Sequence, residues 1–148
     1  MSQAAILVHA TSVAIGGHAV LLRGPSGSGK SDLALRLIDA GARLVADDQT
    51  RIWRDGNVLL VRAPEPIAGL IEVRGLGIVR VQAVPAARLA LIVDLVAVQH
   101  LERLPEPSSE TIFGLAIPRV ALAPFEASAP VKLRLALAAA TGEGNLAS

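Results

Sequence analysis

Cysteine and tyrosine are absent from this chain of 148 residues, and the only aromatic residues are one tryptophan and two phenylalanines. Without cysteine the chain can form no disulfide and no thiolate metal site, which suits a reducing compartment, so we expect a cytoplasmic protein. Because 52% of the residues are hydrophobic and only 2% are aromatic, the core must consist of Leu, Val, Ile and Ala. The length predicts a single domain, residues 1–148.

A charge excess and long apolar runs are also lacking. The net charge is +1 and the basic residues form no cluster, so we expect no nucleic-acid partner. The N-terminal segment has no basic flank or cleavage-like site, which argues against a signal peptide. Charged residues, Gly or Pro break every apolar run well before about 18 residues, so we expect no membrane span.

Lysine is scarce too, since Lys30 and Lys132 are the only two among 14 basic residues. Lys30 lies in a segment that matches G-x-x-x-x-G-K-[ST], the P-loop motif. Glycines let backbone N–H groups turn inward and form an anion-binding cradle, and the following helix directs its positive end at the phosphates. Lys30 would reach the β and γ phosphates, and the Ser31 hydroxyl would bind Mg²⁺. The motif therefore predicts binding of ATP and Mg²⁺ by Gly24, Pro25, Ser26, Gly27, Ser28, Gly29, Lys30 and Ser31.

The segments on either side of the motif fit that interpretation. Residues 19–22 are all apolar, as in a buried strand, which we expect to end at Arg23, and residues 31–40 place their apolar side chains on one helical face before Gly41. Residues 43–46 predict a second strand. The three elements predict one βαβ unit of an α/β fold, in which ligands gather at the carboxyl ends of the strands.

Asp47 and Asp48 follow the second of these strands, so we expect them near the bound phosphates. Adjacent side chains of an extended segment point to opposite sides. One of the two is therefore a candidate for holding Mg²⁺ through water, and the other for facing an incoming hydroxyl group. The alternative is a solvated turn after a strand.

The remaining elements are strand-rich. The glycine pair 16–17 predicts a hairpin between residues 5–15 and 19–23, and residues 55–57 predict a second hairpin. The other expected elements are strands at 50–54, 58–63, 87–98 and 111–122, a strand–loop–strand segment at 69–82, a polar loop at Glu106–Glu110, and a helix over 130–142 with Ser128 as its N-cap.

Glu72 and Arg74 are two residues apart in the 69–82 segment, so they share one face of an extended chain. A carboxylate for a metal and a guanidinium for phosphate charge would suit phosphoryl transfer, and an exposed ion pair is the alternative. His9 and Arg103 carry weaker signals, because a lone strand histidine or loop arginine is more often a packed or surface residue.

Together, the upstream His9, the P-loop, "LVADD" and "EVRGLGI" resemble the catalytic domain of bacterial HPr kinase/phosphorylase. The resemblance is clear over residues 5–80 and fainter to about residue 137. It implies an α/β P-loop domain with a mixed, strand-rich sheet, related to that of phosphoenolpyruvate carboxykinase. It also implies transfer of phosphate from ATP to a seryl hydroxyl of HPr, a phosphocarrier protein, and the reverse phosphorolysis.

The resemblance also implies roles for individual residues. His9 corresponds to an active-site histidine, and Lys30 to the P-loop lysine. Asp48 corresponds to the carboxylate that exchanges the seryl proton, which leaves Asp47 as the candidate for Mg²⁺. Ser31 and Glu72 correspond to magnesium-binding positions; Arg74 lies in the signature segment, and Arg103 corresponds to a catalytic arginine.

The chain differs from the longer family members, which are hexamers with an extra N-terminal domain. It resembles the short alphaproteobacterial form, and we expect a homo-oligomer, with the hexamer as one candidate. The family's basic Pro-Arg-Gly-rich loop is replaced by "APFEASAPVK", which leaves the phosphorylase activity open. Two alternatives stay open: a small-molecule kinase or carboxykinase-like enzyme, and a non-catalytic regulator that binds ATP.

Overall fold

The computed structural model describes residues 4–143, which form a curled, strand-rich sheet with two helices. The elements are β1 (Ala5–Val8), β2 (Ala10–Ile15), β3 (His18–Arg23), α1 (Lys30–Asp39), β4 (Arg43–Ala46), β5 (Thr50–Asp55), β6 (Val58–Arg62), β7 (Leu70–Val73), β8 (Gly77–Arg80), β9 (Ala87–Leu95), β10 (Ser108–Ile112), β11 (Leu115–Leu122) and α2 (Ala129–Ala140), with short 3-10 turns at Glu65–Ile67 and Val98–His100. The two helices have 10 and 12 residues. Within the described part of the chain no helix is long and apolar enough to cross a membrane.

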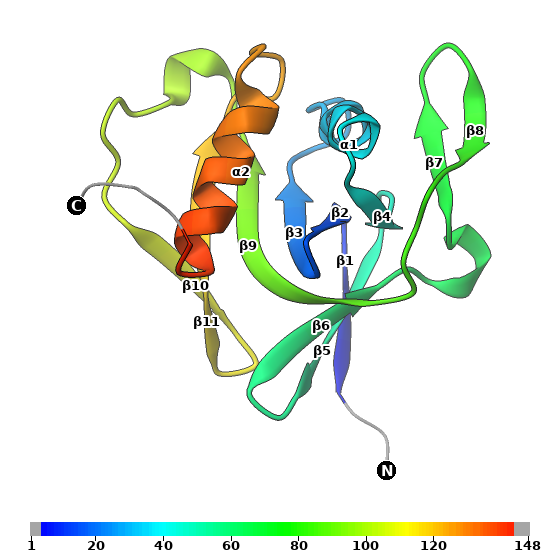
Figure 1. Ribbon diagram of the computed structural model, residues 1–148, viewed down its shortest axis with the longest axis horizontal. Helices are drawn as coiled ribbons and strands as arrows, with labels where there is room; N and C mark the ends of the chain where they lie inside the picture. The colour runs from blue at the N-terminus through cyan, green and yellow to red at the C-terminus, as the bar shows by residue number, and fades with distance from the viewer. Residues whose placement is uncertain (1–3, 144–148) are drawn as a thin grey trace.

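The main sheet is mixed, as expected from the resemblance. Its strand order is β1-β5-β6-β9-β3-β2-β4, and β11 joins β9 while β10 pairs only with β11. The central strands β3 and β9 are parallel, whereas β2 is antiparallel to both β3 and β4. The β7–β8 hairpin forms a separate two-stranded sheet. In Figure 1 this hairpin and the loop that follows β9 rise on either side of α1.

Both faces of the central strands are covered, which explains why β3 is apolar at each of its four inner positions, Ala19 to Leu22. Val20 and Leu22 face the cluster beneath the helices, while Ala19 and Leu21 face a second cluster. In the second cluster, β5, β6 and β11 curl over the sheet and contribute Ile52, Leu59, Val61 and Ile117. A strand buried on both faces has no polar side to present, so its sequence lacks alternation.

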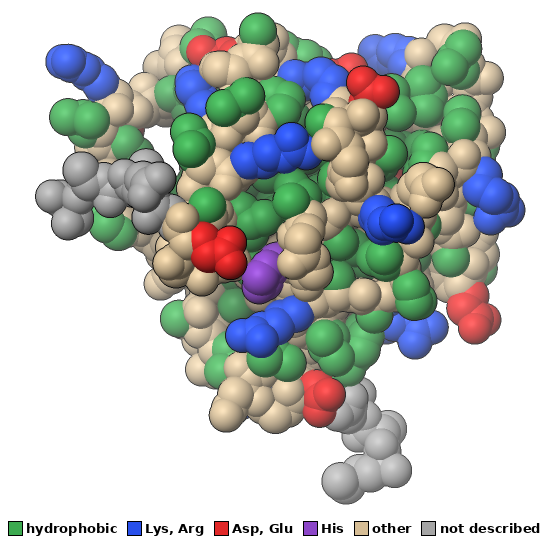
Figure 2. Space-filling view, viewed as in Figure 1, with side chains coloured by type: hydrophobic (Ala, Val, Ile, Leu, Met, Phe, Trp, Pro, Cys, Tyr) green, Lys and Arg blue, Asp and Glu red, His purple; other side chains and the backbone are tan. Residues whose placement is uncertain are grey.

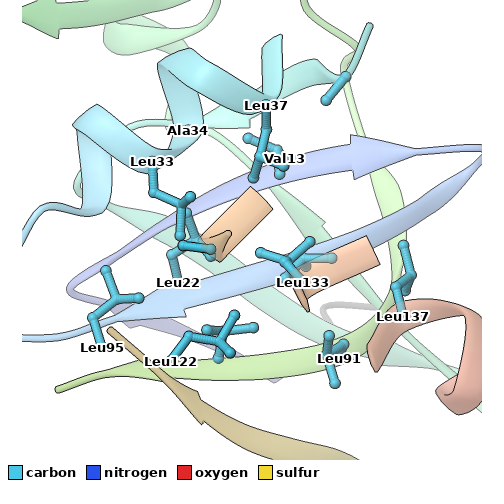
Figure 3. Close-up of a cluster of buried hydrophobic side chains, with 14 of the residues drawn as sticks. Val13, Leu22, Leu33, Ala34, Leu37, Leu91, Leu95, Leu122, Leu133 and Leu137 are labelled. Atoms are coloured by element: carbon cyan, nitrogen blue, oxygen red, sulfur yellow. The ribbon is translucent and has the colours of Figure 1, made fainter. Parts of the chain in front are cut away.

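The two helices pack on the same face of the sheet (Figure 1). Leu33 and Leu37 of α1 point toward strands β2 and β3, and Leu133 and Leu137 of α2 point toward the same cluster (Figure 3). Aliphatic side chains alone fill this region, as the shortage of aromatics predicts.

Leu133 offers a direct test of this packing, because its side chain is completely buried while Leu135 on the same helix is 54% exposed. We expect Leu133→Ala to lower the free energy of unfolding by about 2–5 kcal/mol, through lost burial and the cavity left behind. The control Leu135→Ala should change it by less than about 0.5 kcal/mol. Urea unfolding measures both, and similar losses in the two variants would contradict this packing.

Two strand predictions near the N-terminus need correction. Residues 5–15 form two strands, because the chain changes partners at His9: β1 pairs with β5, and β2 with β3 and β4. The predicted βαβ unit is also interrupted, since β2 lies between β3 and β4. Because β2 is antiparallel to both neighbours, β3 and β4 still run in the same direction, and their carboxyl ends still meet at one edge.

The segment after β9 also differs from the prediction. Ser108, Ser109 and Glu110 were expected in a polar loop, but they form β10 by pairing with β11. The expected strand over 111–122 is instead interrupted by a hairpin turn at Phe113–Gly114, where both residues have positive φ. Two consecutive positive φ values are typical of a type I′ turn. Pairing with the next strand across this hairpin thus overrode the local polar composition.

Candidate active site

The P-loop, residues 24–31, connects β3 to α1, and its glycines are required by its geometry. Gly27 and Gly29 have φ values of 81° and 99°, a region that favours glycine. A Cβ atom on Gly24 would lie 2.4 Å from Ser28 Oγ, and one on Gly29 would lie 2.9 Å from the Phe125 ring. Side chains at Gly24 and Gly29 would therefore collide with the loop itself or with residues that follow β11.

Lys30 is 6% exposed, and its ammonium group donates to the carbonyl oxygens of Gly24 (2.7 Å) and Pro25 (3.1 Å). The charge is therefore held at the loop rather than in solvent. Ser28 Oγ is buried in the same loop and has no hydrogen-bond partner among the described residues. A buried hydroxyl group without a hydrogen-bond partner destabilises the folded state by about 1–3 kcal/mol. The loop therefore contains one unsatisfied polar group in addition to the buried Lys30 cation.

Asp47 lies against the first turn of α1, at the carboxyl end of β4. Its Oδ1 accepts hydrogen bonds from Ser31 Oγ (2.7 Å) and Thr11 Oγ1 (3.1 Å), and its Oδ2 accepts one from the backbone N–H of Glu72 (2.9 Å). Asp47 is 8% exposed. This carboxylate thus connects the P-loop helix to β2 and β7.

Asp48 turns the other way, as expected for adjacent carboxylates. Its Oδ1 lies 2.6 Å from His9 Nε2, and both side chains are about half exposed, 60% for Asp48 and 49% for His9. Asp48 has a φ of 66°, and its backbone N–H donates to Thr11 Oγ1 at 3.0 Å. Aspartate tolerates this left-handed conformation better than most residues. An accessible carboxylate, held by a histidine, therefore lies next to the buried one.

The donor set fits a magnesium ion. The Ser31 hydroxyl donates its proton to Asp47, which leaves its oxygen lone pairs free for a cation. The Glu72 carboxylate is exposed, and its main chain is bonded to Asp47. No cluster of three or more carboxylate or imidazole groups is found over residues 4–143. Such sparse protein ligation is typical of Mg²⁺ sites that are completed by substrate phosphates.

The two predicted arginines are less closely placed. Arg74 lies in the turn between β7 and β8, so it does not share a strand face with Glu72 as predicted. Arg103 lies in the loop between β9 and β10. Both are exposed, and neither forms a hydrogen bond or ion pair with another residue in the described part of the chain. The structure therefore assembles His9, Lys30, Ser31, Asp47, Asp48 and the backbone of Glu72, but not these two side chains.

Sequence reasoning missed Thr11, which contacts both aspartates. The residue is completely buried in β2, and its hydroxyl accepts from Asp48 N–H and donates to Asp47. Its position two residues after His9 on a strand was the only signal available. That signal could not be used without knowing that β2 lies beside β4.

An ion cluster at the start of the P-loop was also missed. Arg23 contacts Asp94 and Glu110, and Arg119 contacts the same two carboxylates. Hydrogen bonding from Arg23 holds the pKa of Glu110 below its usual value, and the hydrogen bond to Glu110 raises the pKa of Arg23. Arg23 and Glu110 are therefore both charged at neutral pH.

A hollow of about 340 Å³ lies at the other edge of the sheet, where β3 and β9 begin. Its lining includes His18, Arg88 and Thr141, and none of the predicted site residues. Figure 2 shows this face of the molecule, with a histidine side chain below helix α2. The P-loop follows the opposite ends of the strands, so this hollow is separate from the candidate active site.

These features define a P-loop domain: a buried strand leads through a glycine-rich loop into a helix that begins with Lys30 and Ser31, and a carboxylate from a parallel strand lies beside that helix. A family model described as the HPr serine kinase C-terminal domain matches residues 2–133. The chain therefore belongs to this family, and the predicted α/β P-loop fold with a mixed, strand-rich sheet is confirmed.

Individual relatives and a solved structure agree with this assignment. The HPr kinase/phosphorylase of Leptothrix cholodnii is 41% identical over 128 residues, which is 78% of this chain and 39% of that protein. The HPr kinase/phosphorylase of Limosilactobacillus reuteri is 36% identical over 127 residues, 78% of this chain and 40% of that protein. The chain thus spans about two fifths of the length of these curated relatives. The structure of the Hpr(Ser) kinase/phosphatase from Coxiella burnetii matches with a TM-score of 0.82 and 26% identity, over 93% of this chain and 97% of that one.

Proposed function

We propose that this chain is a magnesium-dependent protein-serine kinase, which transfers the γ-phosphoryl group of ATP to a seryl hydroxyl of HPr or an HPr-like phosphocarrier. One observation carries the proposal: the accessible Asp48 carboxylate, paired with His9 at 2.6 Å, lies next to the buried Asp47 that bonds Ser31 of the P-loop. The names of the family and of its relatives support the identity of the acceptor.

Each residue of the site has a part in this chemistry. The P-loop backbone and Lys30 bind the phosphates, and Ser31, Glu72 and Asp47 would hold Mg²⁺, which neutralises phosphate charge when bound. Asp48 accepts the proton of the seryl hydroxyl as the new O–P bond forms and the bond to the β-phosphate oxygen breaks, releasing ADP. His9 holds the Asp48 carboxylate in place. Arg74 and Arg103, from the family resemblance, would offset charge on the transferring group. Most of the rate enhancement would come from positioning and electrostatics.

A protein acceptor suits the surface around the P-loop. Leu76, Leu104 and Phe125 are 80%, 85% and 71% exposed. They lie in the β7–β8 turn, in the loop after β9 and against Gly29, so they surround the P-loop end of the sheet. Exposed apolar side chains around a site are typical of contact with another protein, whereas a small-molecule kinase would need to enclose its substrate.

Phosphorolysis of the seryl phosphate is a second candidate activity, favoured by the names of the relatives. The segment that replaces the family's basic loop contacts the P-loop, because the side chains of Pro124 and Phe125 lie against Gly29. A change at Pro124 or Phe125 would therefore act close to the phosphates.

The decisive experiment incubates the purified chain with ATP, Mg²⁺ and candidate phosphocarriers, followed by mass spectrometry. We expect one phosphoryl group on a serine of an HPr-like protein, and none when EDTA replaces Mg²⁺. Adding inorganic phosphate afterwards tests for reversal and pyrophosphate release. ATP binding without transfer to any phosphocarrier would favour the non-catalytic regulator, and transfer to a small molecule alone would favour the other alternative.

We also propose, from the resemblance, that residues 1–148 act as one catalytic domain in the cytoplasm and form a homo-oligomer. Light scattering of the purified chain measures the assembly state, and a monomer at assay concentrations would contradict the last point.

A further inference from the structure

Four charged side chains meet where β3 leads into the P-loop. The Arg23 guanidinium donates to both oxygens of Asp94, at 2.8 and 3.2 Å, and to Glu110 Oε2 at 2.7 Å. Arg119 completes the cluster, at 3.2 Å from Glu110 Oε1 and 3.4 Å from Asp94 Oδ2. Two cations and two anions are thus balanced, and Arg23, Asp94 and Glu110 are each only about a quarter to a third exposed.

The positions of these residues along the chain are informative. Arg23 is the last residue of β3 and immediately precedes Gly24. Asp94 lies one residue before the end of β9, and Glu110 lies in β10. The segment between these strands, residues 96–107, contains Arg103. It leaves β9 at the same sheet edge as the P-loop, because β3 and β9 are parallel and Arg23 pairs with Asp94, and in Figure 1 it lies beside α2. The Arg23 guanidinium therefore connects the two strands that flank this segment to the residue that immediately precedes the P-loop.

Backbone pairing does not make the same connection. The hydrogen-bonded path from β3 to β10 runs through β9 and β11, so the Arg23–Glu110 pair links two strands that are not neighbours in the sheet. Arg23 makes one charge-assisted hydrogen bond to Glu110 and a bidentate pair to Asp94, and such a combination fixes orientation as well as distance. Loss of Glu110 would leave the β10–β11 backbone pairing intact while removing the side-chain link between this end of the 96–107 segment and Arg23.

We propose that Arg23, Asp94 and Glu110 form a brace that positions the 96–107 segment, and with it Arg103, relative to the phosphates in the P-loop. These three are positioning residues, because none of them lies in the phosphate cradle. The inference rests on the proposed phosphotransfer, in which a small displacement of a group near the reacting atoms slows the chemical step.

The test compares Glu110→Ala with Glu126→Ala. Glu126 is a matched control, because its carboxylate is also 31% exposed and forms an ion pair, to Lys132 at 3.0 Å, away from the brace. Hydrogen exchange of the free protein measures the mobility of residues 96–107, and steady-state kinetics with ATP and the phosphocarrier measure kcat and the KM for ATP.

For Glu110→Ala we expect amide exchange in 96–107 to be at least about threefold faster, because a charge-assisted hydrogen bond is lost. We expect kcat to fall by about tenfold, while the KM for ATP stays within about twofold, because the nucleotide contacts remain. Glu110→Gln keeps an acceptor for Arg23 and should lie between wild type and Glu110→Ala. It also carries the test if Glu110→Ala does not fold.

Equal exchange in the Glu110 and Glu126 variants would overturn the brace, as would faster exchange with an unchanged kcat. A wild-type chain that transfers no phosphate to any phosphocarrier would instead refute the proposed function. The exchange measurement would still decide whether the segment is held by Glu110, so the two failures are distinguishable.

Discussion

Asp48→Asn should lower kcat for phosphotransfer by about 10²- to 10⁴-fold, the usual contribution of a positioned general base. Asparagine has nearly the shape of aspartate and can still accept a hydrogen bond from His9, but it cannot take the seryl proton. ATP affinity should change little, because the Asp48 side chain contacts His9 and not the P-loop. Phosphocarrier assays measure kcat, and calorimetry measures ATP binding.

The control for this prediction is Asp55→Asn, which changes an exposed aspartate at the end of β5, remote from the P-loop. It should leave both quantities at wild-type values. A kcat near wild type in Asp48→Asn would show that another group accepts the proton. The buried neighbour Asp47, which already accepts hydrogen bonds from Ser31, Thr11 and Glu72, would then need to be reconsidered.

Lys30→Ala should weaken ATP binding by at least about tenfold and reduce phosphotransfer even further, because a charge-assisted hydrogen bond contributes about 1.5–3 kcal/mol. The ammonium group is already held at the loop by the carbonyls of Gly24 and Pro25, so little additional ordering is needed when phosphate arrives. Loss of the same cation in the transition state, where phosphate charge is redistributed, would lower kcat as well.

Lys132→Ala is the natural control, because Lys132 is the other lysine of the chain and pairs with Glu126 on the surface. An exposed pair of this kind contributes little, about 0–1 kcal/mol, so ATP affinity and kcat should be unchanged. An ATP affinity in Lys30→Ala equal to that in Lys132→Ala would contradict the phosphate-binding role of Lys30.

Much of the candidate site could be predicted from local sequence. Lys30, Ser31 and the three glycines of the P-loop lie within eight consecutive residues, and a contiguous loop carries its own geometry. Asp47 was expected beside it because strand 43–46 follows directly after the helix. Arg74 was placed less well, since a strand face was assumed where the chain turns at residues 74–76.

The pairing of His9 with Asp48 could not be derived from local sequence, because 39 residues separate them. His9 lies between β1 and β2, and it approaches Asp48 because the chain changes strand partners there. That change depends on the pairing of β1 with β5. The resemblance to a known family suggested roles for both residues, but not their contact. Thr11, which bonds both aspartates, was missed for the same reason.

The sequence by itself determined the P-loop, the aliphatic core and the elements around them, because these depend on residue type and on spacing within one strand, loop or helix. Only the tertiary structure decided that β2 lies between β3 and β4, that Ser108–Glu110 extend a strand, and that Arg23 meets Asp94 and Glu110. These features depend on which strands pair, and pairing is decided by burial over the whole sheet rather than by any one segment.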